Sequence, residues 1–205
     1  MKDINSIKTD IAAMSRFALE MLELTHQAFM EHDVDLIAES LKRETKLNDL
    51  EKNITTDLIV WGRGCIKKEE KLKVALYADV IGDLELIGDY CKDILERVQI
   101  KIEEKLLFSQ DAVDEYNGLY AITVNALKEI VSALDRDDLS SIKEVMKNQE
   151  HLDTLVDEYR QKHNQRMLDG VCTPLACNMF LNMLDFTAAI YYHIKKIAKS
   201  LAKIK

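Results

Sequence analysis

The residues best suited to binding a metal ion are Glu85 and Asp89, four positions apart in the segment GDLELIGDYCKDILERV. Residues at i and i+4 lie on one side of an α-helix, so a single helix could present both carboxylates to one ion. Ala78 and Gly82 fall on the same strip, and their small side chains are expected to let a neighbouring helix or an ion approach. Spacing alone is weak support, because acidic pairs on helix flanks are usually solvated.

A second polar group lies in the segment YRQKHNQR, where His163 and Arg166 are one helical turn apart. Cationic groups are favoured near a helix C-terminus, so the pair could cap the helix. The alternative is contact with phosphate, another anion or a partner protein. The remaining histidines are scattered and show no triad spacing: His26, His32, His151 and His193. We therefore expect no catalytic residues and no enzymatic activity.

The four cysteines form no CxxC pair and have no histidine at zinc-ligand spacing: Cys65, Cys91, Cys172 and Cys177. This pattern predicts reduced thiols and a cytoplasmic protein. The first ten residues, MKDINSIKTD, lack the apolar core of a signal peptide. No window approaches the roughly 18 apolar residues of a membrane span. Any membrane association is therefore expected to be docking at the surface.

Composition favours helices. The chain has 205 residues, is 47% hydrophobic and 31% charged, and contains one proline and six glycines. Long stretches therefore lack the turn residues that a β-rich chain requires. The net charge of −8 and pI near 5.2 argue against nucleic-acid binding, which needs a concentrated basic surface. A basic run near the C-terminus is the local exception, and dipole compensation explains it better than contact with anionic lipid or an acidic partner.

Apolar residues recur at spacings of three and four, and breaks in this pattern predict six helices. Ser109 and Thr173 are expected N-caps, and the glycines of Gly62-Arg63-Gly64 are expected to supply a left-handed C-cap. The predicted helices cover approximately residues 4–31, 35–61, 69–107, 110–135, a fifth ending near 169–170, and a sixth beginning after Thr173-Pro174.

The two halves of the chain repeat the same plan. Asp33 and Ile37 correspond to Asp138 and Ile142 at a constant separation, and the third and sixth helices carry matching apolar rows. Stripes this wide can meet two neighbours at once, as a three-helix bundle requires. The sequence therefore predicts an all-α protein of two tandem three-helix bundles, residues 1–108 and 109–205, packed as one compact unit.

The motif from Asp83 to Asp89, DLELIGD, resembles the signature of the PhoU family of phosphate-transport regulators. Glu44 to Asn48 resembles the acidic ExxxD element that this family carries in its second helix. The stretch from His163 to Cys172 is similar to the HxxR…GxC pattern of PhoU-like domains in bacterial sodium/phosphate cotransporters. The resemblance implies two helical bundles, a role in phosphate uptake or its signalling, and a multinuclear iron or zinc site.

The sequence departs from that family pattern in ways that restrict the expected metal site. Asn48 replaces the second acid of the second helix, and Ala188 and Tyr192 stand in the sixth helix where Glu85 and Asp89 stand in the third. A neutral amide is a weaker ligand for a hard cation than a carboxylate. The expected ligands of an iron or zinc ion therefore lie in the first bundle only: Glu44, Asn48, Glu85 and Asp89.

The function that these features predict is a PhoU-like regulatory or accessory protein that binds a phosphate transporter or a phosphate-sensing protein. A homodimer is compatible with this prediction. Three alternatives stay open: a carboxylate-bridged metal-binding helical protein, the soluble tail of a sodium/phosphate cotransporter, and a helical scaffold without a phosphate link.

Overall fold

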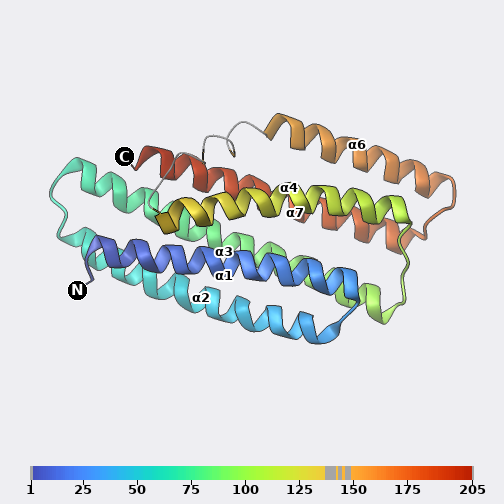
Figure 1. The fold of residues 1–205 in the computed structure, drawn as a ribbon, viewed down its shortest axis with the longest axis horizontal. Coiled ribbons are helices and arrows are strands. Elements are labelled where there is room, and N and C mark those ends of the chain that lie inside the picture. Colours follow the sequence, from blue (N-terminus) through green and yellow to red (C-terminus); the bar gives the residue numbers. More distant parts are fainter. Residues whose placement is uncertain (1, 137–141, 143–144, 146–148, 205) are drawn as a thin grey trace.

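The computed structural model describes residues 2–136, 142, 145 and 149–204, and Figure 1 shows that its helices run side by side along the long axis of the molecule. Position 138, which the repeat pairs with Asp33, lies outside the described residues. The described part is all-α, without a strand. Its helices are α1 (Ile4–Glu31), α2 (Val34–Arg63), α3 (Lys68–Glu103), α4 (Gln110–Arg136), α6 (Gln149–Leu168) and α7 (Pro174–Lys203).

Side-chain caps define several helix starts, as the sequence predicts. The Ser109 hydroxyl accepts a hydrogen bond from the Ala112 N–H at 3.3 Å, and the Thr173 hydroxyl accepts one from the Ala176 N–H at 3.3 Å. Asp33 caps α2 by accepting from the Asp35 N–H at 2.8 Å. Each cap satisfies a donor that the first turn of a helix leaves unpaired. The predicted caps Ser109 and Thr173 are confirmed.

The predicted glycine cap of α2 is wrong. Gly64 adopts φ −84°, in the right-handed region, whereas the described glycine with positive φ is Gly170, at +70°. Gly170 ends α6 in the left-handed conformation that glycine adopts without steric cost. The α3 helix also ends earlier than predicted, at Glu103, because Lys105 takes a positive φ of 51°. The chain turns there instead of continuing to Leu107.

The helices in the described part of the chain pack as two groups of three that share one core. Helices α1, α2 and α3 contact one another, and so do α4, α6 and α7. The two groups meet through α3 against α7, the most extensive helix pair, and through α1 against α4. A single cluster of buried side chains runs through both groups. The predicted bundle architecture is therefore confirmed, and the shared core makes α3 and α7 the central helices.

The apolar rows predicted from spacing are buried. In α3 the row of Val80, Ile87 and Ile94 is fully buried, as is the matching α7 row of Met183, Ile190 and Ile197. Burying a large aliphatic side chain contributes about 1.5–3 kcal/mol, so these rows supply much of the stability of the fold.

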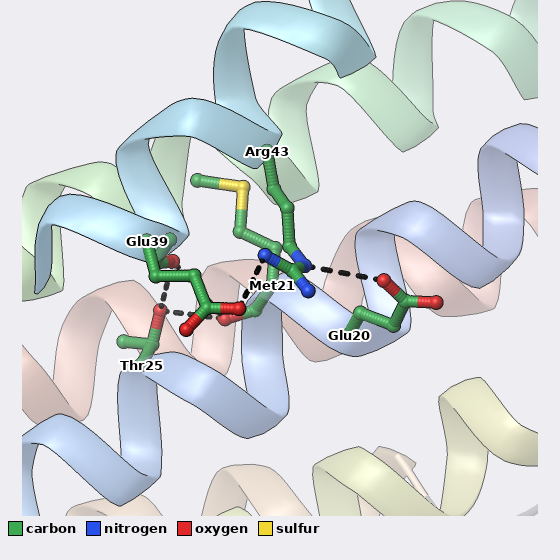
Figure 2. A network of polar contacts seen from close by, with 6 residues as sticks. Glu20, Met21, Thr25, Glu39 and Arg43 are labelled. Carbon is green, nitrogen blue, oxygen red and sulfur yellow. Dashed lines mark hydrogen bonds and ion pairs between the residues drawn. The ribbon is translucent and has the colours of Figure 1, made fainter. Parts of the chain in front are cut away.

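Polar contacts between α1 and α2 are grouped around one turn of α1 (Figure 2). Arg43 on α2 bonds Glu20 of α1 at 3.2 Å and Glu39 of its own helix at 2.9 Å. Beneath this exposed cluster, the buried Thr25 hydroxyl donates to the Met21 carbonyl at 2.8 Å and lies 3.5 Å from Ser40. Buried hydroxyls are thus hydrogen-bonded, and the outer ion pairs add little stability because water screens them.

Close packing of α2 on α3 depends on Gly88. A Cβ at this position would lie 2.3 Å from Leu47 Cδ2, whereas a Cβ at Gly82 would meet nothing within 4 Å. The sequence expected Gly82 to let a neighbouring helix or an ion approach; no described helix does so, and the approach of an ion stays a prediction. The close approach occurs about two turns further along α3, at Gly88.

Alanine substitutions at these two glycines should have opposite effects on stability. Gly82→Ala should stabilise the protein by roughly 0.5–1 kcal/mol, because alanine favours the helix and has space. Gly88→Ala gains the same helix preference but crowds the buried Leu47, and overpacking costs about 1–3 kcal/mol. Urea unfolding should therefore place Gly88→Ala below Gly82→Ala by at least 1 kcal/mol. Equal midpoints for the two variants would contradict this account of the α2–α3 contact.

Candidate functional site

The predicted metal ligands lie along the boundary between α2 and α3, and with Glu51 they form what we call the acidic strip: Glu44, Asn48, Glu51, Glu85 and Asp89. The Asn48 amide donates to Glu44 Oε1 at 3.0 Å. Lys92 Nζ lies 3.5 Å from the same oxygen. The Glu85 and Asp89 side chains lie close enough for each to perturb the pKa of the other. The structure thus brings the two predicted acidic elements of α2 and α3 into one neighbourhood.

Mutual repulsion and partial burial perturb the acids of the strip. Desolvation raises the pKa of Glu85, and the charges of Asp89, Glu51 and Glu44 raise it further. Desolvation also raises the pKa of Asp89, with Glu44 as the next cause, and Lys92 opposes this shift. Like charges in one partly buried place disfavour ionisation. A bound cation or a basic partner group would relieve this repulsion.

The donor set of the strip fits a hard or borderline cation. Asn48 Oδ1 is buried without a hydrogen-bond partner, and an unpaired buried acceptor is costly unless something binds it. Carboxylate and amide oxygens are suitable ligands for such ions. The carboxylates of Glu44, Glu85 and Asp89 do not all lie within 4.8 Å of one another. Among the described His, Cys, Asp and Glu residues, the group that meets this distance lies elsewhere in the structure. Metal binding at the strip therefore stays a prediction.

Replacing Glu85 by glutamine should stabilise the metal-free protein at neutral pH. The carboxyl ionises near pH 4.3 in the unfolded chain and at higher pH in the folded one, so stability falls as pH rises through that interval. Removing the charge should recover roughly 0.5 kcal/mol at pH 7, the scale of a like-charge helix pair. The gain should shrink at pH 4, where most of the carboxyl is protonated in both states.

Thermal unfolding of Glu85→Gln at pH 7 and pH 4 checks this prediction. Glu96→Gln is the matched control, because Glu96 lies exposed on the same helix. A Glu85→Gln variant less stable than wild type at pH 7 would show that the strip is not under electrostatic strain.

Asp83, the first residue of the DLELIGD motif, faces the other half of the molecule. Its Oδ1 accepts hydrogen bonds from His193 Nδ1 at 2.8 Å and from Lys196 Nζ at 2.6 Å, both on α7. The side chain of Asp83 is 3% exposed, and its hydrogen bond raises the pKa of Lys196. The motif therefore divides its acids between the acidic strip and the α3–α7 interface.

His163 and Arg166 meet a partner that the sequence analysis missed. Arg166 forms a two-point ion pair with Glu115 of α4, with distances of 3.1 and 2.5 Å, and donates to His163 Nδ1 at 3.2 Å. The His163 ring stacks on Phe180 at 4.2 Å. Burial first, and then the Arg166 charge, lower the pKa of His163. Arg166 thus has an internal counter-ion, and its contact with an external anion or partner stays a prediction.

The prediction of four reduced cysteines is wrong for one pair. Cys172 and Cys177 form a disulfide, while Cys65 and Cys91 are free and buried. The turn after α6 brings Cys172 to the first turn of α7, where Cys177 lies. Sequence separation did not reveal this contact, because it depends on how the chain reverses between two helices.

Glu115 and Asp83 were missed although the sequence carries a signal for both. Glu115 lies on the same helical row as Leu119, and Asp83 stands between Val80 and Ile87 on an apolar row of α3. A charged residue within such a row must be buried, and buried charges require partners. The row pattern could therefore have marked both acids as paired, although it could not identify their partners.

Comparison with known proteins supports the helical architecture. Residues 11–98 match the model of the PhoU domain. The structure matches PhoU from Pseudomonas aeruginosa with a TM-score of 0.89 and 17% identity, covering 98% of this chain and 96% of that one. It matches the phosphate transport system regulatory protein PhoU from Streptococcus pneumoniae with a TM-score of 0.86 and 14% identity, covering 98% and 93%.

No curated protein sequence matches the chain. Within the described residues, no helix is long and apolar enough to cross a bilayer. The matched residues 11–98 run from α1 to the last turns of α3, so they include the whole acidic strip. Residues 11–98 of this chain thus match the PhoU domain model, and the chain has the fold of solved PhoU structures over nearly its whole length.

Proposed function

We propose that this protein is a non-catalytic, cytoplasmic regulator of phosphate transport that acts by binding a phosphate transporter or a phosphate-sensing protein. The observation that carries the proposal is the acidic strip, which lies within the residues matched as a PhoU domain. The similar structure from Streptococcus pneumoniae is described as a phosphate transport system regulatory protein, which supports the same role here.

The strip suits recognition better than hydrolytic or redox catalysis. Its acids lie on the outer boundary of α2 and α3, and they are only partly buried. Partial burial first, and then the charges of neighbouring acids, raise the pKa values of Glu85 and Asp89. A positively charged group would offset both effects. A basic segment of a partner protein, or a cation shared with it, is the complementary chemistry.

A metal ion is part of this proposal. Iron or zinc would be held by Glu44, Glu85 and Asp89, with the amide oxygen of Asn48 as a weaker fourth ligand. Such an ion would neutralise the strip and fix the spacing of α2 and α3. Elemental analysis of untagged protein, purified with its disulfide intact, tests this part. If the protein contains no iron, zinc or manganese and retains none of these ions on titration, the metal part of the proposal is wrong. The proposed regulatory role would still stand.

Phosphate uptake by intact cells tests the regulatory role. Deleting the gene should alter uptake of radiolabelled phosphate or the phosphate-starvation response, and the wild-type gene should restore it. Unchanged uptake and unchanged starvation response, in both replete and starved cells, would reject the proposal.

A further inference from the structure

The α6–α7 turn gathers three side chains with metal-binding chemistry. One ring nitrogen of His163 and the sulfur atoms of Cys172 and Cys177 all lie within 4.8 Å of one another. His163 projects from the last turns of α6, Cys172 lies in the turn, and Cys177 lies in the first turn of α7. Among the described residues, no other group of three His, Cys, Asp or Glu side chains brings its ligand atoms within 4.8 Å of one another.

A second observation points to a missing ligand. His163 is 2% exposed, and its Nε2 atom is buried without a hydrogen-bond partner. Arg166 lies 3.2 Å from Nδ1 and can only donate to it, so Nε2 carries the ring proton in this state and could bind an ion once that proton moves to Nδ1. Buried polar atoms in native proteins nearly always have a partner. An unpaired imidazole nitrogen beside two sulfurs therefore suggests a site whose occupant is absent in the disulfide state.

We propose that His163, Cys172 and Cys177 bind one zinc-type divalent cation when the Cys172–Cys177 disulfide is reduced. Two thiolates and one imidazole form a known three-ligand set for zinc, with water in the fourth position. Zinc–sulfur bonds of about 2.3 Å at tetrahedral angles place the two sulfurs about 3.8 Å apart, which side-chain rotation can reach from the disulfide. The half-buried Cys172 leaves access for the ion and for that water.

Local structure favours the required charge states. Cys177 stands in the first turn of α7, where the helix dipole stabilises a thiolate. Cys91 is a poor competitor, because burial raises its pKa to about 12. The turn is held by the left-handed Gly170 and by the Val171 N–H donating to the Arg166 carbonyl at 2.9 Å.

The oxidised and metal-bound states exclude each other. A dithiol reductant breaks the Cys172–Cys177 bond, delivers two electrons and two protons, and becomes a disulfide itself. Metal binding then releases the two thiol protons. Because Arg166 donates to Nδ1, the neutral ring carries its proton on Nε2. That proton must move to Nδ1 as Nε2 binds the ion, which displaces Arg166 from His163 but leaves its pair with Glu115.

Cobalt binding by the purified full-length chain tests this proposal. The protein is reduced with a phosphine, which is oxidised to its oxide with oxygen from water, and is then freed of reductant without air. Titration with Co²⁺ should produce thiolate-to-cobalt charge-transfer absorption at one ion per chain, and Zn²⁺ should abolish it. The oxidised protein should show no such band. Carboxylates produce none either, so the acidic strip cannot mimic the result.

Variants complete the test. Cys177→Ser should remove the band, His163→Gln should weaken Co²⁺ binding at least tenfold, and the control Cys65→Ser should leave both unchanged. Cys172→Ser, in the exposed turn, provides the same readout if Cys177→Ser does not fold. No charge-transfer band in the reduced wild type, or a band that survives in the Cys172→Ser variant, would overturn the proposal.

Discussion

Glu115→Gln should destabilise the protein by about 3 kcal/mol, because it leaves the Arg166 guanidinium buried without its counter-ion. The side chains of Arg166 and Glu115 are only 14% and 10% exposed, so water cannot replace the lost carboxylate. The pair joins α4 to α6, and Arg166 also lies over the Phe180 ring of α7. For a chain of this size the loss corresponds to a fall of roughly 6–12 °C in Tm, measured by calorimetry.

An exposed ion pair in the same half provides the control. Arg160 of α6 bonds Asp185 of α7 at 2.5 Å, and its partner is 48% exposed. Exposed pairs contribute about 0–1 kcal/mol, so Asp185→Asn should change Tm by only a few degrees. Equal effects of Glu115→Gln and Asp185→Asn would contradict the conclusion that burial makes the Glu115–Arg166 pair indispensable.

Asp83→Ala should be the second most damaging of these substitutions, with a loss of roughly 2–3 kcal/mol. It removes hydrogen bonds from His193 and Lys196, at 2.8 and 2.6 Å, and hydrogen bonds to charged groups contribute about 1.5–3 kcal/mol each. The loss stays at this scale because Lys196 is 43% exposed and water can solvate it. Chemical unfolding monitored by circular dichroism measures the change.

Asp79→Ala is the matched control for Asp83→Ala, since Asp79 lies one turn earlier on α3 and is exposed. Its substitution should change stability by less than about 0.5 kcal/mol. If Asp83→Ala were as mild as Asp79→Ala, the contact of the motif with α7 would not stabilise the junction of the two halves.

Much of the fold could be predicted from the sequence, because helix periodicity and caps are local. The row of Val80, Ile87 and Ile94 is buried as its spacing indicates, and Thr173 caps α7 as predicted. The end of α3 was misplaced because nothing in the sequence requires Lys105 to take a positive φ. The role of Gly88 was missed because it depends on Leu47 of another helix.

The candidate sites were harder to predict because they depend on contacts between helices. The proximity of Glu85 to Asp89 could be predicted because one helix presents both, while their role as metal ligands stays a prediction. The partners of Asp83 and Arg166 come from α7 and α4, far away in the sequence. The proximity of His163, Cys172 and Cys177 depends on the shape of the α6–α7 turn. Spacing rules for metal-binding motifs do not describe this arrangement, so the sequence did not predict it.

We propose that the acidic strip of the first half carries the regulatory function. Radiolabelled phosphate uptake in a deletion strain tests this claim, with the strain complemented by wild type, by Glu85→Gln/Asp89→Asn, or by Asp153→Asn/Asp157→Asn. The last pair has the same spacing and lies exposed on α6. We predict that wild type and the α6 variant restore normal uptake while the strip variant, present at equal abundance, does not. Full restoration by the strip variant would contradict the account.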